Sequence, residues 1–243
     1  LVGKSVYAEI SYNDAGGAPV STTTNSVTVQ NINDAPTGSV EMQGAVIQGE
    51  ALTADLTGVY DPDNKYSDST TTDELGIVEL GSVTNFKWMA GGQDISREDG
   101  NGTLSSLQLT QEHVGKVITV DVTYTDAHGE SETVSSGQSS PIQNLNDAPT
   151  GAATIVGADT ATQFGMLTAD ISAISDPDNS SRPTEAVVEG EVTGYTWFAD
   201  DVEINGQTGK NLTLAQEHVG KIITVDVAYT DAFGATETVD SNS

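Results

Sequence analysis

Residues 114–129 read VGKVITVDVTYTDAHG, and closely related phrases begin at two other places in the chain. They are VGKSVYAEISYNDAGG from Val2 and VGKIITVDVAYTDAFG from Val219, so the starting positions are 112 and 105 residues apart. These periods lie far above the roughly 20–50 residues of solenoid repeats, and a segment of this size can enclose its own hydrophobic core. The sequence therefore predicts a row of separate domains joined by linkers.

A second phrase marks the domain boundaries. It reads NINDAPTG from Asn31 and NLNDAPTG from Asn144, and combines a turn-forming Asn-Asp pair with a rigid Ala-Pro pair. We expect residues 1–32 to be the C-terminal part of a preceding repeat, 33–145 to be a complete repeat, and 146–243 to be a nearly complete one.

The alternation of apolar and polar residues indicates strands throughout. In the phrase from Val114, every second residue is apolar (Ile118, Val120, Val122 and Tyr124), which is typical of a half-buried strand. No segment has a helical stripe. Short amphipathic strands at regular spacing predict an all-β chain of tandem immunoglobulin-like sandwiches joined end to end. In the complete repeat, we expect strands near 38–43, 51–57, 85–90, 104–110, 116–125 and 131–143, with Trp88 in the core.

The composition favours cations as partners. The chain has 36 Asp and Glu against 8 Lys and Arg, with a formal net charge of −28 and no Cys. Such a chain is repelled by nucleic acid and by anionic membranes, so we expect neither as a partner. Without Cys, no disulfide or thiolate zinc site can stabilise it. No apolar run approaches a membrane span, so we expect no membrane insertion.

Three acidic motifs should meet at one end of each sandwich, where the B–C loop, the F–G loop and the start of strand A converge. Four carboxylates in one place repel each other, whereas calcium takes 6–8 oxygen ligands from carboxylates, Asn side chains and carbonyl groups. Zinc would want His or Cys instead. The predicted calcium ligands are Asn33, Asp34, Asp61, Asp63 and Asp126 in repeat 33–145, and Asn146, Asp147, Asp176, Asp178 and Asp231 in repeat 146–243.

A further ligand is expected at the opposite end of the complete repeat. Glu112, in the turn between strands E and F, should face the linker that carries Asn146 and Asp147, and Glu50 in the A–B loop should lie near it. This placement predicts a second calcium site at the junction between repeats.

Several of these motifs resemble those of known families. NLNDAPT resembles the linker motif of cadherins, and the DPD and TDA phrases lie where cadherins place aspartate ligands. The full series NDAPTG, DPDN, LTQEHVGK and YTDAHG resembles the immunoglobulin-like or cadherin-like tandem repeats of giant RTX-type bacterial surface adhesins. This resemblance implies a calcium-stiffened extender at the bacterial cell surface or outside the cell, projecting a distal binding domain. Asn144, Ala148 and the TQFG segment at 162–165 depart from the cadherin pattern.

We expect no enzyme, and two alternative functions remain open. The pair Glu189 and Glu191 resembles a glycosidase carboxylate couple, but it lies in a loop whose counterpart in repeat 33–145 differs, which favours a solvated acidic loop. One alternative is a ligand-binding module built on the insertions 64–84 and 180–193. The other is a filament subunit, because residues 1–32 supply only two strands, whose apolar face needs a partner. We favour a neighbouring copy of the chain over the adjacent repeat as that partner.

Overall fold

The computed structural model describes residues 2–64, 76–95, 104–179 and 185–241. Within these residues the chain is all-β, with strands, turns and single-turn 3₁₀ helices but no α-helix. None of the described helices is long and apolar enough to cross a membrane. The contacts divide the chain into two compact units, here called the first unit (1–46, 50–108 and 116–141) and the second unit (47–49, 109–115 and 142–243).

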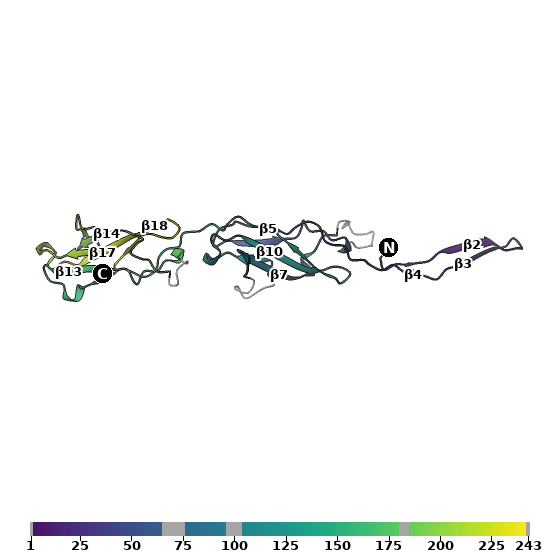
Figure 1. Cartoon of the computed structure of the whole chain (residues 1–243), viewed down its shortest axis with the longest axis horizontal. Coiled ribbons are helices and arrows are strands. Elements are labelled where there is room, and N and C mark those ends of the chain that lie inside the picture. Colours follow the sequence, from purple (N-terminus) through teal and green to yellow (C-terminus); the bar gives the residue numbers. More distant parts are fainter. Residues whose placement is uncertain (1, 65–75, 96–103, 180–184, 242–243) are drawn as a thin grey trace. The chain divides into compact units, whose positions relative to one another are not determined.

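The sandwich of the first unit consists of two antiparallel sheets (Figure 1). The three-stranded sheet has the order β5-β6-β9 and the four-stranded sheet the order β11-β10-β7-β8. The strands are β5 (Glu41–Gln43), β6 (Ala51–Asp55), β7 (Val83–Ala90), β8 (Gln93–Asp94), β9 (Ser106–Gln108), β10 (Ile118–Thr125) and β11 (Ser131–Ser135).

The second unit repeats this topology, with sheets in the order β12-β13-β16 and β15-β14-β17-β18. Its strands are β12 (Thr154–Val156), β13 (Met166–Asp170), β14 (Val192–Ala199), β15 (Val202–Glu203), β16 (Asn211–Thr213), β17 (Ile223–Thr230) and β18 (Thr236–Asp240). Lettered from A, both units pair strands A, B and E in one sheet and G, F, C and C′ in the other, which is an immunoglobulin-like arrangement.

The alternating strands bury one face each. In β10 the residues alternate strictly between buried and half-buried, beginning with the buried Ile118. In the second unit, Leu167 and Leu212 from one sheet and Trp197 and Val225 from the other belong to a single buried cluster. Side chains of two sheets therefore share one core, and the predicted all-β, immunoglobulin-like sandwich is confirmed. The end-to-end tandem arrangement stays a prediction.

Some strand limits differ from those that the sequence predicts. Strand G was expected over 131–143, but β11 ends at Ser135, and beyond it the chain makes isolated bridges such as Val114 with Ile142. The short strand β8 lies in the stretch between C and E, which the alternation could not divide. Both tryptophans are core residues, because Trp88 is 3% and Trp197 0% exposed.

Residues 2–32 form a hairpin without a core. Strand β2 (Glu9–Asn13) pairs with β3 (Pro19–Thr23), and β1 (Ser5–Val6) pairs with β4 (Val27–Thr28). Ile10 and Tyr12 are 51% and 53% exposed, whereas their equivalents Val122 and Tyr124 in β10 are fully buried. The predicted apolar face is therefore present, and its partner stays a prediction.

Candidate metal centre

The NDAPTG phrase is held against the B–C loop by backbone pairing. In the first unit, Thr37 and Tyr60 exchange hydrogen bonds of 2.7 and 2.9 Å between their main-chain atoms. Gly38 has a φ of +90°, and a Cβ there would lie 2.0 Å from the carbonyl oxygen of Gly58, so only glycine allows this approach. The phrase and the DPDN loop are consequently neighbours.

The DPDN loop buries its carboxylates. Asp61 is 0% and Asp63 5% exposed. Asp61 Oδ2 accepts the hydroxyl of Tyr124 at 2.7 Å and its Oδ1 accepts the Asp63 N–H at 2.9 Å. Asp63 Oδ2 in turn accepts the N–H of Asp34 at 2.7 Å, which joins the start of the sandwich to the loop. The structure thus brings Asp34, Asp61 and Asp63 together, as the sequence predicted.

The F–G loop supplies the third element. Asp126 is 6% exposed, and its Oδ1 accepts the N–H groups of His128 and Glu130 at 2.8 and 2.9 Å. The N–H of Ala127 binds Asn64 Oδ1 at 3.0 Å, so the B–C and F–G loops are tied together. Asp126 Oδ2 is buried and has no hydrogen-bond partner among the described residues.

The second unit repeats these hydrogen bonds. Asp178 Oδ2 accepts the Asp147 N–H at 2.8 Å, and Asp176 Oδ2 accepts the hydroxyl of Tyr229 at 2.7 Å. Asp231 Oδ1 accepts two backbone N–H groups at 2.8 and 2.9 Å, as Asp126 does. In the loops of this network, the described buried side-chain atoms without a hydrogen-bond partner are Asp178 Oδ1, Asp231 Oδ2 and Asn179 Nδ2.

The electrostatics of this cluster, which we call the second acidic cluster (Asp147, Asp176, Asp178, Asp231), are unfavourable. Burial raises the pKa of Asp178, and the charges of Asp176 and Asp231 raise it further, against the lowering effect of the Asp147 N–H and Asn144. Burial, together with Asp176 and Glu237, also raises the pKa of Tyr229. Across the described residues, no lysine, arginine or histidine forms an ion pair with these carboxylates. A cation would relieve the repulsion.

The carboxylates do not stand in a ready coordination shell. Among the described residues, no group of three or more His, Cys, Asp or Glu side chains has the spacing of a metal-ligand set. The donor chemistry nevertheless fits calcium, because buried carboxylate oxygens of Asp126, Asp178 and Asp231 have no described hydrogen-bond partner. The equivalent cluster of the first unit (Asp34, Asp61, Asp63, Asp126) is called the first acidic cluster below.

Two glutamates belong to these networks although the sequence analysis did not include them. Asn33 Nδ2 donates to Glu132 at 2.6 Å, and Asn146 Nδ2 donates to Glu237 at 2.7 Å. The hydroxyl of Tyr229 lies 2.7 Å from Asp176 Oδ2 and 2.9 Å from Glu237 Oε2, and its single proton can serve only one of them. The repeated phrase ETV in both strands G was the signal that could have identified them.

The structure places Glu112 and Glu50 differently from the other predicted ligands. Both are exposed, and in the described residues the Glu112 side chain makes no hydrogen bond. The NLNDAP segment is bound by Gln111, which donates to Asn144 at 3.4 Å, and above all by Gln48, which is 8% exposed. Its Nε2 donates to Asp147 Oδ2 at 2.5 Å and its Oε1 accepts the Leu145 N–H at 3.2 Å. A calcium ligand role for Glu112 stays a prediction.

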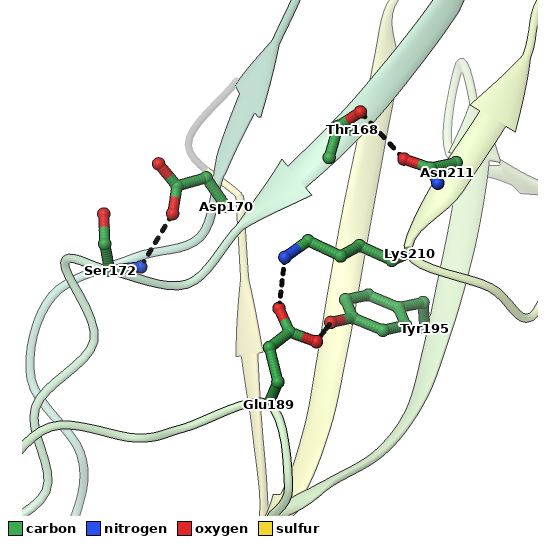
Figure 2. Close-up of polar contacts among 7 residues, drawn as sticks. All are labelled: Thr168, Asp170, Ser172, Glu189, Tyr195, Lys210 and Asn211. Carbon is green, nitrogen blue, oxygen red and sulfur yellow. Dashed lines mark hydrogen bonds and ion pairs between the residues drawn. The ribbon is translucent and has the colours of Figure 1, made fainter.

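The carboxylate pair that resembled a glycosidase couple has a different environment. The Glu189 carboxylate pairs with Lys210 and accepts the Tyr195 hydroxyl at 2.8 Å (Figure 2). Burial alone would raise the pKa of Glu189, but the hydrogen bonds from Lys210 and Tyr195 lower it. A carboxyl group held in its charged form by a lysine is poorly suited to act as a general acid.

The two B–C insertions, proposed as an alternative binding site, lie partly outside the described residues, at 65–75 and 180–184. The described part of the first insertion contains a 3₁₀ turn, Leu80–Ser82.

Comparisons with known proteins leave the family open. No family model matches the chain. No curated protein matches it either. Among solved structures, it is similar to the FN1–FN3 domains of chicken CNTN1, with 12% sequence identity over 98% of this chain and 78% of that chain, at a TM-score of 0.18. A likeness at this TM-score carries no argument about function.

Proposed function

We propose that the chain is a calcium-stabilised spacer, a pair of immunoglobulin-like repeats that holds other parts of a cell-surface or secreted bacterial adhesin at a distance. The observation that carries the proposal is the duplicated acidic cluster. Two units with different loops keep the same hydrogen bonds among the same side chains, and each keeps a buried aspartate oxygen without a described partner. An arrangement needed only for a turn does not require buried charge, which is costly unless compensated.

The residues that would hold calcium are Asp61, Asp63 and Asp126 in the first unit and Asp176, Asp178 and Asp231 in the second. Bound there, the ion would neutralise the mutual repulsion of the carboxylates and link the loops that carry them. Asp34 and Asp147 already bind the clusters through their backbone N–H groups, and their own carboxylates would be additional oxygen ligands.

The consequence for a spacer is stiffness where each sandwich begins. The NDAP segment carries few apolar residues and would be mobile if it depended on packing alone. It is instead attached to the cluster through the Asp34 N–H and through Asn33, whose side chain binds Glu132. Fixing the cluster with a cation therefore fixes the segment that leads into the sandwich. The resemblance to adhesin repeats supports an extracellular location, where calcium is available at millimolar levels.

The experiment is a thermal melt of the chain in 10 mM calcium and in excess chelator, with magnesium as a control ion. We expect calcium to raise the melting temperature and magnesium to raise it much less, because magnesium prefers to keep its waters. Identical melting curves in calcium and in chelator would contradict the proposal.

A further inference from the structure

One segment of the second unit, residues 142–147, is held at its start by main-chain pairing. It reads IQNLND. Ile142 pairs with Val114 and Gln143 with Ile47, both as parallel bridges within the second unit. Ile142 is only 2% exposed, so the start of the segment is packed as well as paired. The rest of the segment, which carries the aspartate, is held by side chains instead.

Gln48 holds the end of this segment with both ends of its amide group. Its Nε2 donates to Asp147 Oδ2 at 2.5 Å, and its Oε1 accepts the Leu145 N–H at 3.2 Å. An amide is the uncharged side-chain group that can donate and accept in this way. A glutamate here would place a second carboxylate against Asp147, and a lysine could not accept the Leu145 N–H. Because Gln48 is 8% exposed, leaving either end of its amide unpaired would be costly.

The aspartate that Gln48 binds is also bonded to the second acidic cluster. The Asp147 N–H donates to Asp178 Oδ2 at 2.8 Å, and Asp178 is 0% exposed. Asp147 therefore has a bond in each direction, from its carboxylate to Gln48 and from its N–H to Asp178. Both bonds depend on the position of one residue, so the loss of the first should weaken the second.

A second, weaker link to the cluster runs through Asn144. Gln111 Nε2 donates to Asn144 Oδ1 at 3.4 Å, which is long for a hydrogen bond. Burial raises the pKa of Asp178, whereas the Asp147 N–H and the Asn144 side chain lower it. The charged form of Asp178, which a calcium ligand must have, is therefore favoured by two groups that the glutamines hold in place.

We propose that Gln48 is a positioning residue of the second acidic cluster and that Gln111 assists it. Gln48 acts through Asp147, and Gln111 acts through Asn144. The cluster then binds a cation tightly only while residues 144–147 are docked, and by linkage a bound cation strengthens their docking. The part of this inference that concerns calcium rests on the proposed function. The positioning itself is a property of the chain without the ion.

The positioning role is tested without calcium, by NMR measurement of amide hydrogen exchange of the full chain in excess chelator. We expect Gln48→Ala to speed exchange of the Asp147 N–H about tenfold or more, although this N–H is bonded to Asp178 and not to Gln48. Gln111→Ala removes only the longer hydrogen bond and should have a smaller effect. Gln207→Ala, at an exposed glutamine of the same unit, should have none.

The amide of Val227 distinguishes positioning from a general loss of stability. Val227 is fully buried in the core strand β17, so its exchange reports on unfolding of the whole second unit. We expect its exchange rate to be the same in the unsubstituted chain and in all three variants. An unchanged Asp147 exchange rate in Gln48→Ala, or an equal acceleration at Val227, overturns the proposal.

The link to the cation is tested by titrating calcium into the same variants and following the amide signals of Asp147 and Asp34, one for each cluster. Gln48→Ala should raise the calcium dissociation constant of the second acidic cluster about tenfold and leave that of the first unchanged. Equal dissociation constants for the second cluster with and without the substitution overturn the link. A chain on which calcium has no effect contradicts the link and the spacer proposal together, whereas the exchange experiment in chelator decides the positioning of Asp147 by itself.

Discussion

Replacing Asp231 by asparagine separates the structural role of this carboxylate from its proposed role as a ligand. Asp231 Oδ1 accepts the N–H groups of Phe233 and Ala235, and an asparagine oxygen can accept both. Its Oδ2 is buried without a described partner, and the substitution places an amide nitrogen there. The backbone of the loop is therefore preserved while the charge and one potential ligand are removed.

The expected change in unfolding free energy depends on whether calcium is present. In chelator, weaker neutral hydrogen bonds and relief of carboxylate repulsion nearly offset each other, so the change in unfolding free energy should be within about 1 kcal/mol. In 10 mM calcium, a dissociation constant of about 0.1 mM, within the range of extracellular calcium modules, corresponds to about 2.7 kcal/mol of stabilisation. Loss of this term in Asp231→Asn should lower the melting temperature of the second unit by about 10–20 °C in calcium.

The control is Asp170→Asn, in the same unit. Asp170 Oδ1 also accepts a local N–H, from Ser172 at 2.9 Å, but it lies outside the second acidic cluster (Figure 2). Calorimetry in calcium and in chelator measures both variants. We expect Asp170→Asn to change the melting temperature of the second unit by the same amount in calcium and in chelator. An Asp231→Asn effect that is also the same in both media would refute the reasoning.

Three further outcomes are expected. Asp126→Asn should lower the calcium-dependent melting transition of the first unit and leave that of the second unchanged, as two calorimetric transitions would show, because separate cores unfold independently. Tyr229→Phe should lower the free energy of unfolding by about 1.5–3 kcal/mol, measured by urea unfolding in the presence of chelator, because it removes a hydrogen bond to a buried carboxylate. Asp240 lies directly opposite Asp226 on the neighbouring strand. Burial, and after it the charge of Asp240, raises the pKa of Asp226 above the ordinary value of 3.8. Folding stability is therefore lost as the pH rises through the pKa that Asp226 has in the folded state. Asp240→Ser, which copies the Ser135 of the first unit, should therefore add about 0.5 kcal/mol at pH 7 and nothing below about pH 3, measured by urea unfolding.

The sandwich could be predicted because its cores come from strict alternation. The pattern from Ile118 to Tyr124 has one face that is wholly apolar, and only a strand buries such a face. The limits of strand G were not predictable, because the residues after Ser135 are polar and are held by isolated bridges rather than by a continuous ladder. Alternation contains no information about where a strand stops pairing.

The acidic clusters were predictable in part, because their aspartates belong to sequence motifs that recur in both repeats. The sequence brought Asp34, Asp61 and Asp126 to one end of the sandwich, and their hydrogen-bonded loops lie there. The role of Gln48 was missed, because an uncharged side chain in a loop gives no chemical signal until its buried position is known. Glu112 was chosen for its place in the turn between strands E and F; its side chain is exposed, and its role as a ligand stays a prediction.

Direct calcium binding is the decisive measurement, made by equilibrium dialysis on the full chain and on the Asp126→Asn, Asp231→Asn and double variants. The account predicts at least two bound ions for the unsubstituted chain, at least one fewer for each single variant, and the loss of both of these ions in the double variant. A chain that binds no calcium up to 10 mM, or a double variant that binds as much as the unsubstituted chain, would contradict it.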